Sequence, residues 1–170
     1  MVTAIGLIFQ IFGIFLIMFY DFSMSKPLPY WMHVFMAFCL FMYQTLDAID
    51  GKHARNTNRS SPVGQLMDHG CDAFSNSFLI IMVLQSHRLG GNIYTIAVQI
   101  LVQLTFYVVQ WHEYYTGYLL THINNMGVTE FQFIGMAIIM IPVFLGNVSE
   151  TKLFNGMVSV SELLVYLNGI

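Results

Sequence analysis

Four stretches of this chain, residues 1–20, 30–46, 93–111 and 131–146, contain no Asp, Glu, Lys or Arg. A helix that crosses the bilayer core needs about 20 predominantly apolar residues. Charged residues make up only 9% of the sequence, whereas an average soluble domain carries about 25%. So few charges cannot cover a water-exposed surface. The sequence therefore predicts an all-α protein, a polytopic bundle of transmembrane helices.

The apolar stretches also predict where the helices lie. We expect helices over 1–20, 30–46, 63–85, 93–111 and 131–146, and a partial sixth helix within 147–170. Residues 21–29 read as a turn, 52–62 as a polar loop and 112–129 as a mixed segment. Pro142 falls inside the fifth helix, where a membrane helix tolerates proline if neighbours satisfy the freed carbonyl. The expected total is about five to six membrane helices.

The few charges are concentrated in one segment. Four of the nine acidic residues and three of the six basic residues fall between residues 47 and 72. An ionised side chain at bilayer depth costs about 2.5–3.5 kcal/mol on insertion scales, so such groups indicate a functional site. The basic residues are Lys52, Arg55 and Arg59, whereas segment 112–129 has no Lys or Arg. By the positive-inside rule, the charged segment is predicted to face the cytosol.

The acidic residues of this segment are spaced so that they share helix faces. Positions i, i+3, i+4 and i+7 of a helix lie on one face, and here they are occupied by Asp47, Asp50, Gly51 and Ala54. Asp68 and Asp72 form a second pair on the next helix, one turn after Gly64. Two carboxylates on each of two helices suit Mg²⁺, which binds carboxylates together with substrate phosphates. Shared carboxylates also match a two-metal site.

Other interpretations of these residues stay open. Aspartates at helical spacing often form a solvated face, and in so apolar a chain they could line the path of a membrane cation transporter. Glycine and alanine could serve helix packing, and Lys52 and Arg55 could anchor the membrane surface. Arg55 argues against a cation path, because a cation gains nothing from a neighbouring guanidinium. No Cys or His pair has zinc-ligand spacing, and no glycine-rich nucleotide loop is present.

The complete pattern over residues 47–72, Asp-x2-Asp-Gly-x2-Ala-Arg-x8-Gly-x3-Asp-x3-Asp, resembles the signature of the CDP-alcohol phosphotransferase family. The flanks Tyr43-Gln44-Thr45-Leu46, Asp68-His69-Gly70-Cys71 and Val128-Thr129-Glu130 are similar to its eukaryotic choline/ethanolamine phosphotransferase branch. The resemblance covers residues 3 to 135. It implies an enzyme of phospholipid synthesis that moves phosphocholine or phosphoethanolamine from a CDP-alcohol to diacylglycerol and releases CMP.

The resemblance also implies roles for individual residues. Two Mg²⁺ ions, or Mn²⁺ as the alternative, would be held by Asp47, Asp50, Asp68 and Asp72. The substrate-binding residues would be Gly51, Ala54, Arg55, Ser61 and Gly64. Arginine suits this role because its guanidinium holds phosphate oxygens through paired hydrogen bonds that lysine cannot form.

Two residues are candidates for the base that takes the proton of the acceptor hydroxyl. The broad family pattern implies the last aspartate, Asp72, whereas the choline/ethanolamine branch implies His69 together with Glu130. A carboxylate bound to a metal is a poor base, whereas imidazole titrates near neutral pH and works best there. The sequence therefore favours His69, with Glu130 orienting and polarising the imidazole.

The resemblance further implies how the chain is organised and where it works. Members of this branch are longer, so we expect residues 1–146 to form the catalytic membrane domain without its N-terminal start. Residues 147–170 would begin a further membrane region that is truncated here. The expected location is the endoplasmic reticulum or Golgi membrane, with a homodimer as an expected assembly and no nucleic acid partner. A catalytically inactive, truncated relic is the alternative.

Overall fold

The computed structural model describes residues 2–57, 61–117, 122–123, 126–145, 152–153 and 158–159, and side chains within 2–57, 61–117 and 131–144. The helices in these residues are α1 (Val2–Tyr20), α2 (Tyr30–Asn56), α3 (Pro62–Ser86), α4 (Ile93–Thr116) and α5 (Val128–Leu145). The strands are two-residue antiparallel pairs: β1 (His122–Ile123) with β2 (Met126–Gly127), and β3 (Lys152–Leu153) with β4 (Val158–Ser159).

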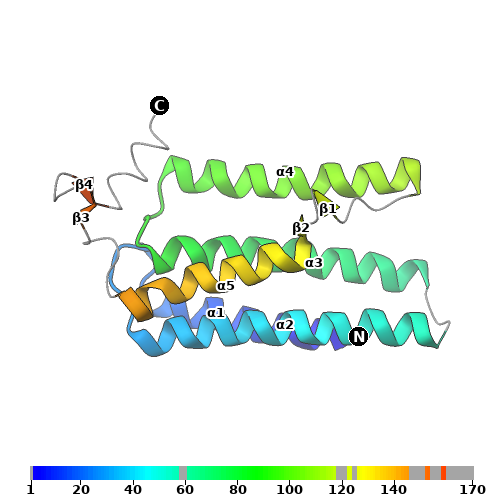
Figure 1. Cartoon of the computed structure of the whole chain (residues 1–170), viewed down its shortest axis with the longest axis horizontal. Coiled ribbons are helices and arrows are strands. Elements are labelled where there is room, and N and C mark those ends of the chain that lie inside the picture. The colour runs from blue at the N-terminus through cyan, green and yellow to red at the C-terminus, as the bar shows by residue number, and fades with distance from the viewer. Residues whose placement is uncertain are drawn as a thin grey trace.

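The five helices form an elongated bundle (Figure 1). α1 and α2 pack against each other, α5 packs on α2 and α3, and α4 lies along the outer edge, where it contacts α3. By length and composition, α1, α2 and α4 could each cross a membrane, and α5 contains a shorter apolar segment, Phe131–Phe144. These helices confirm the prediction of an all-α membrane bundle. Of the five helices in the described residues, three meet the requirement for a full span.

Helix α2 is longer than the polarity of its last turns suggested. It continues to Asn56, so Lys52 and Arg55 lie on a helix rather than in the polar loop expected over 52–62. Over these turns the small and acidic face is half-buried and the other side chains are exposed, and the helix ends where the N–H of Thr57 bonds to the carbonyl oxygen of His53. Its continuation places the two acidic positions Asp47 and Asp50 on α2, as the spacing predicted.

The ends of α3 and α4 follow from their capping residues. The hydroxyl of Ser61 accepts a hydrogen bond from the N–H of Gly64 at 3.1 Å, and proline follows at the first helical position. α4 extends to Thr116, into the segment expected to be mixed, and ends at Gly117, whose φ of 70° is the left-handed conformation favoured by glycine. The partial sixth helix was expected within 147–170, which lies mostly outside the described residues.

Small and polar residues bring α1 close to its neighbours. A Cβ atom on Gly6 would lie 2.9 Å from the Cα of Tyr43, so only glycine lets the α1 and α2 backbones approach this closely. Gln10 Nε2 donates to Ser75 Oγ at 3.0 Å, and this buried hydrogen bond joins α1 to α3. Further along, the apolar core is built by Ile17, Met36, Leu40, Met82 and Ile139. This packing fixes α2 and α3 side by side.

The turn between α1 and α2 is organised by Asp21. Its Oδ1 accepts hydrogen bonds from the N–H and hydroxyl of Ser23 at 3.1 and 2.6 Å. Its Oδ2 accepts from the N–H groups of Ser25 and Lys26, each at 2.7 Å. Hydrogen bonds to a charged carboxylate stabilise it, and they lower the pKa of Asp21 below its ordinary value, the bond from Lys26 contributing most. The turn thus satisfies this buried carboxylate internally.

Candidate functional site

The candidate site lies where the C-terminal part of α2 meets the N-terminal part of α3. Asp47 on α2 faces the charges of Asp68 and Asp72 on α3, and Asp72 also faces Asp68 and His69. All four side chains line the same cavity. The structure therefore brings together three of the four aspartates predicted as metal ligands, with the predicted base beside them.

The fourth aspartate, Asp50, points toward the start of α1. Its Oδ2 accepts hydrogen bonds from the backbone N–H and the hydroxyl of Thr3, at 3.2 and 3.0 Å. Asp50 is absent from the residues that line the cavity. In this conformation it joins α2 to α1, and its predicted role as a metal ligand stays a prediction.

A buried tyrosine orients one of the carboxylates. Tyr43 lies one turn before Asp47 on α2, is fully buried, and donates its hydroxyl hydrogen to Asp72 Oδ1 at 2.8 Å. This bond fixes the Asp72 side chain across the interface between α2 and α3. The sequence placed Tyr43 within the family-like flank, but its apolar surroundings gave no sign of a hydrogen bond to Asp72.

The carboxylates of this site fit a divalent cation in one specific respect. Asp47 Oδ1 is buried and has no hydrogen-bond partner among the described residues, an arrangement that is costly unless another group satisfies the atom. Three carboxylates that face one another also need positive charge between them, and oxygen donors are the ligands that Mg²⁺ prefers. Their side chains do not converge on one point: among the described residues, no group of three or more Asp, Glu, His or Cys is arranged to hold an ion.

The cavity joins the carboxylates to a large apolar space. It has a volume of about 1000 Å³ and extends between α2, α3, α4 and α5. Its polar lining includes Gln44, Asp47, Lys52, Asp68, His69 and Asp72, and its apolar wall includes Phe41, Ile80, Val102, Phe106 and Ile138. A site of this form can hold a molecule with a charged end and a long hydrocarbon part.

The predicted substrate-binding residues lie on the last turns of α2 and at the start of α3, and none of them lines the cavity. The guanidinium of Arg55 lies beside Gly51 on α2, where a Cβ atom would be 3.4 Å from Nη1. Arg55 is exposed, and Ala54 is half-buried on the same helix. Ser61 and Gly64 cap the start of α3 through their mutual hydrogen bond. That capping role accounts for both residues structurally, and their contact with substrate stays a prediction.

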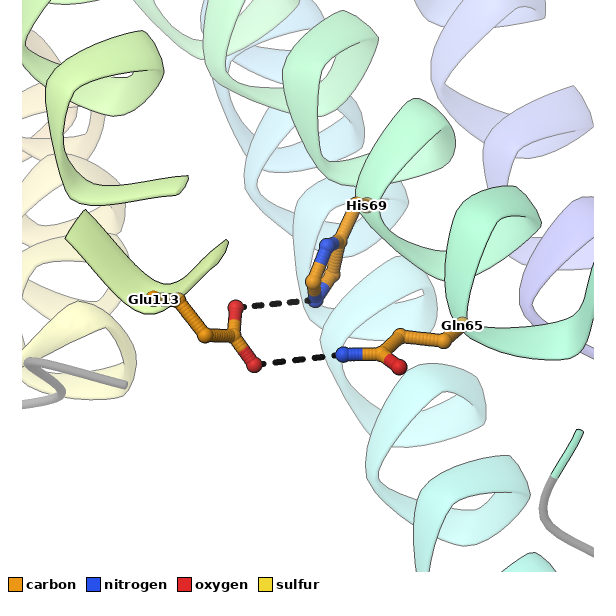
Figure 2. A network of polar contacts seen from close by, with 3 residues as sticks. All are labelled: Gln65, His69 and Glu113. Carbon is orange, nitrogen blue, oxygen red and sulfur yellow. Dashed lines mark hydrogen bonds and ion pairs between the residues drawn. The ribbon is translucent and has the colours of Figure 1, made fainter. Parts of the chain in front are cut away.

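The predicted base, His69, is paired with a residue that the sequence did not single out. Its Nε2 lies 3.8 Å from Oε2 of Glu113, which belongs to the last turn of α4. Oε1 of Glu113 accepts a hydrogen bond from Nε2 of Gln65 at 3.1 Å, as Figure 2 shows. Glu130, the predicted partner of His69, belongs to α5, but its side chain lies outside the described residues.

A signal for Glu113 was present in the sequence. It is the only Asp or Glu between Asp72 and Glu130, and it follows an apolar span directly. The flank around Glu130 resembles the choline/ethanolamine phosphotransferase branch, so the sequence favours Glu130 as the partner of His69. Gln65 carried no comparable signal, because one glutamine at the start of a helix is usually solvated.

Comparison with known proteins agrees with the pattern of aspartates. The CDP-alcohol phosphatidyltransferase family matches residues 1–166 of this chain. Cholinephosphotransferase 1 of Rattus norvegicus is 38% identical over 132 residues, 77% of this chain and 33% of the rat protein. Choline/ethanolaminephosphotransferase 1 of Arabidopsis thaliana is 36% identical over 144 residues, 85% of this chain and 35% of the plant protein.

A third relative, from chicken, has a similar identity and a similar share of its length covered by this chain. Cholinephosphotransferase 1 of Gallus gallus is 40% identical over 124 residues, 72% of this chain and 36% of the chicken protein. The chain thus spans about a third of the length of the curated relatives it matches. Enzymes of this family depend on a divalent metal, which agrees with the oxygen donors of α2 and α3. On the family match across nearly its whole length, this chain belongs to the CDP-alcohol phosphatidyltransferase family.

Proposed function

We propose that this chain transfers phosphocholine or phosphoethanolamine from a CDP-alcohol to diacylglycerol and releases CMP. The observation that carries the proposal is the cavity, in which Asp47, Asp68, His69 and Asp72 lie beside an apolar wall. A reaction between a charged nucleotide and a lipid needs a polar surface for the nucleotide directly beside an apolar surface for the lipid. The relatives named cholinephosphotransferase and choline/ethanolaminephosphotransferase support the same chemistry.

The CDP-alcohol would bind at the carboxylate end. Its diphosphate carries negative charge, so it needs cations between itself and the aspartates. Two Mg²⁺ ions, or Mn²⁺ as the alternative, would be held by Asp47, Asp68 and Asp72. Asp50 would be a further ligand if its hydrogen bonds to Thr3 were broken. The bound metal would neutralise charge on the diphosphate and on the departing CMP. Arg55, exposed at the same end of α2, would hold phosphate oxygens through paired hydrogen bonds.

Diacylglycerol would occupy the apolar part of the cavity. Its acyl chains would lie against side chains such as Phe41, Ile80 and Phe106, which line that part of the wall. Its free hydroxyl would then lie near His69, because the imidazole lines the polar end of the same cavity. Binding of this kind removes hydrocarbon from water and leaves the hydroxyl as the polar group to be placed.

The transfer step follows from these positions. The hydroxyl oxygen of diacylglycerol attacks the phosphorus that carries the choline or ethanolamine. A new P–O bond forms, the P–O bond to CMP breaks, and CMP leaves with that electron pair. The hydroxyl proton passes to the imidazole of His69, and Asp72 remains the alternative acceptor. Tyr43 would hold Asp72 in place through its 2.8 Å hydrogen bond.

The setting of the enzyme follows from its apolar helices. The three helices long enough to span a membrane support an integral membrane protein. We place it in the endoplasmic reticulum or Golgi membrane with the site toward the cytosol, because Lys52 and Arg55 flank the site and favour the cytosolic side. A homodimer is the assembly we expect.

A reconstitution assay tests the proposal. The full chain in vesicles receives radiolabelled CDP-choline or CDP-ethanolamine, diacylglycerol and Mg²⁺, and labelled phospholipid is extracted and counted. We expect product from at least one CDP-alcohol, no product after chelation with EDTA, and none from Asp68→Asn. The ratio of the two products gives the preference for choline or ethanolamine.

The same vesicles separate this proposal from the alternatives. Divalent cation flux without phospholipid product would support the transporter. Absence of product with both CDP-alcohols, in Mg²⁺ and in Mn²⁺, would reject transferase activity for this chain and support the inactive relic. Family membership favours the transferase over the transporter.

A further inference from the structure

We infer that Glu113 is a positioning residue for His69 and that Gln65 holds Glu113 in place. The inference rests on the proposed function, since it concerns the base of that reaction. It deepens that function by assigning a role to a residue outside the aspartate pattern, on a different helix from the metal ligands. Figure 2 shows the three side chains facing one another across α3 and α4.

The geometry of the network supports a role in orientation. Gln65 Nε2 donates to one oxygen of Glu113 at 3.1 Å, which leaves the other oxygen 3.8 Å from His69 Nε2. Neutral imidazole has one N–H donor and one acceptor nitrogen. A carboxylate on the Nε2 side favours the tautomer with hydrogen on Nε2, which leaves Nδ1 free to accept a proton. Catalytic hydrogen bonds are often long before substrate binds and tighten in the complex.

Partial burial makes this contact more than a surface ion pair. The side chains of His69 and Glu113 are only 25% and 20% exposed, so solvent screens them less than it screens an exposed pair. Gly117, one turn later, ends α4 in the left-handed conformation, and its N–H donates a hydrogen bond to the carbonyl oxygen of Glu113 at 2.8 Å. Glu113 therefore projects from a helix end whose geometry is fixed.

A second polar contact between the same helices provides a control. Gln103, on α4, donates from Nε2 to the carbonyl oxygen of Ala73 at 2.9 Å and to Oγ of Ser77. It fastens α4 to α3 without contacting His69. If Glu113 merely fastens α4, then Gln103→Ala will impair the enzyme as much as Glu113→Ala does.

The kinetic test uses the full chain in vesicles and a double-mutant cycle. We expect Glu113→Ala to lower kcat about tenfold, a part of the 10²–10⁴ that a general base contributes, with the KM for CDP-alcohol within about twofold. Glu113→Gln, which retains an acceptor oxygen, should keep most of kcat, and Gln103→Ala should stay near wild type. In a His69→Ala background, Glu113→Ala should cause no further loss, because residues that act as a unit are not additive.

Several results would overturn the inference: an unchanged kcat in Glu113→Ala, an equal loss in Gln103→Ala, or a full further loss in the His69→Ala background. An inactive wild-type chain would instead reject the proposed function. The role of Glu113 is then tested by a measurement that does not need turnover. In ¹⁵N-histidine NMR of the full chain in detergent, the His69 signals are assigned by their loss in His69→Ala. Glu113→Ala should reduce the Nε2-protonated tautomer of His69; an unchanged tautomer ratio rejects the inference.

Discussion

Aspartate has opposite surroundings in two regions of this molecule. In the turn between α1 and α2, Asp21 accepts four hydrogen bonds from Ser23, Ser25 and Lys26. At the other end of α2, Asp47 is half-buried, faces two further carboxylates, and has one oxygen without a partner among the described residues. The turn satisfies both oxygens of Asp21, whereas the described residues leave Oδ1 of Asp47 without a hydrogen-bond partner.

The contrast separates carboxylates that build the fold from carboxylates that await a ligand. A buried carboxylate surrounded by donors stabilises the folded chain. A buried carboxylate surrounded by other carboxylates destabilises it until a cation arrives. Replacement of Asp47 should therefore lower activity without lowering stability, whereas replacement of Asp21 should lower stability without lowering activity.

The largest effect is expected for Asp47→Asn. Its kcat should fall by roughly 10³, the scale on which removal of an electrostatic group in an active site acts. In EDTA its Tm should equal or exceed that of wild type, because one repelling charge is gone. Mg²⁺ should raise the Tm of wild type and not that of the variant. Turnover assays and thermal unfolding in detergent measure both; a variant with normal turnover, or a Tm well below wild type in EDTA, contradicts the contrast.

A smaller loss is expected for His69→Ala. Removal of a general base lowers kcat by about 10²–10⁴, and we expect the lower end because the metal ligands remain. The Mg²⁺-dependent rise in Tm should persist. His53→Ala, exposed on the last turns of α2, is the control and should keep wild-type turnover. If His69→Ala retains nearly full turnover while Asp72→Asn loses it, then Asp72 is the base.

The apolar part of the cavity should affect lipid binding alone. Val102→Trp would fill space in the wall formed by α4, and we expect the apparent KM for diacylglycerol to rise about tenfold, the scale of misfit in a hydrophobic pocket. Leu104→Trp is the control, because Leu104 is 54% exposed and does not line the cavity. Kinetics at varied diacylglycerol in mixed micelles measure the effect. An equal change in both variants would place the lipid elsewhere.

Much of this molecule could be predicted from the sequence for identifiable reasons. Uncharged stretches of helical length predict membrane helices because an ionised group in lipid is so costly. The faces containing Asp47 and the pair Asp68 and Asp72 follow from helical periodicity, which is local. The extension of α2 past Lys52 was missed, because polar side chains at the end of a helix resemble those of a loop.

The contacts between helices could not be predicted in the same way. That Asp50 bonds to Thr3, and that Glu113 faces His69, depends on how α1 and α4 are rotated against α2 and α3. Rotation and register are set by the packing of many side chains and not by the spacing within one helix. The role predicted for Glu130 stays a prediction because its side chain lies outside the described residues, and those of Ser61 and Arg55 stay predictions because they concern contact with a substrate.

The smallest effect, and the sharpest check of the contrast, is expected for Asp21→Asn. The amide would turn its NH₂ group toward the N–H groups of Ser25 or Lys26, so we expect the Tm at pH 7 to fall by a few degrees while turnover stays unchanged. The pKa of Asp21 is lower in the folded protein than in the unfolded chain, so its stabilisation is fully present above the unfolded pKa of about 3.9. It is lost as the pH falls toward the folded pKa. The difference in Tm between wild type and variant, measured by intrinsic fluorescence in detergent, should therefore shrink as the pH is lowered from 7 to 3. A difference that stays constant with pH would mean that Asp21 acts through its shape rather than its charge, and the two aspartates would then differ in packing alone.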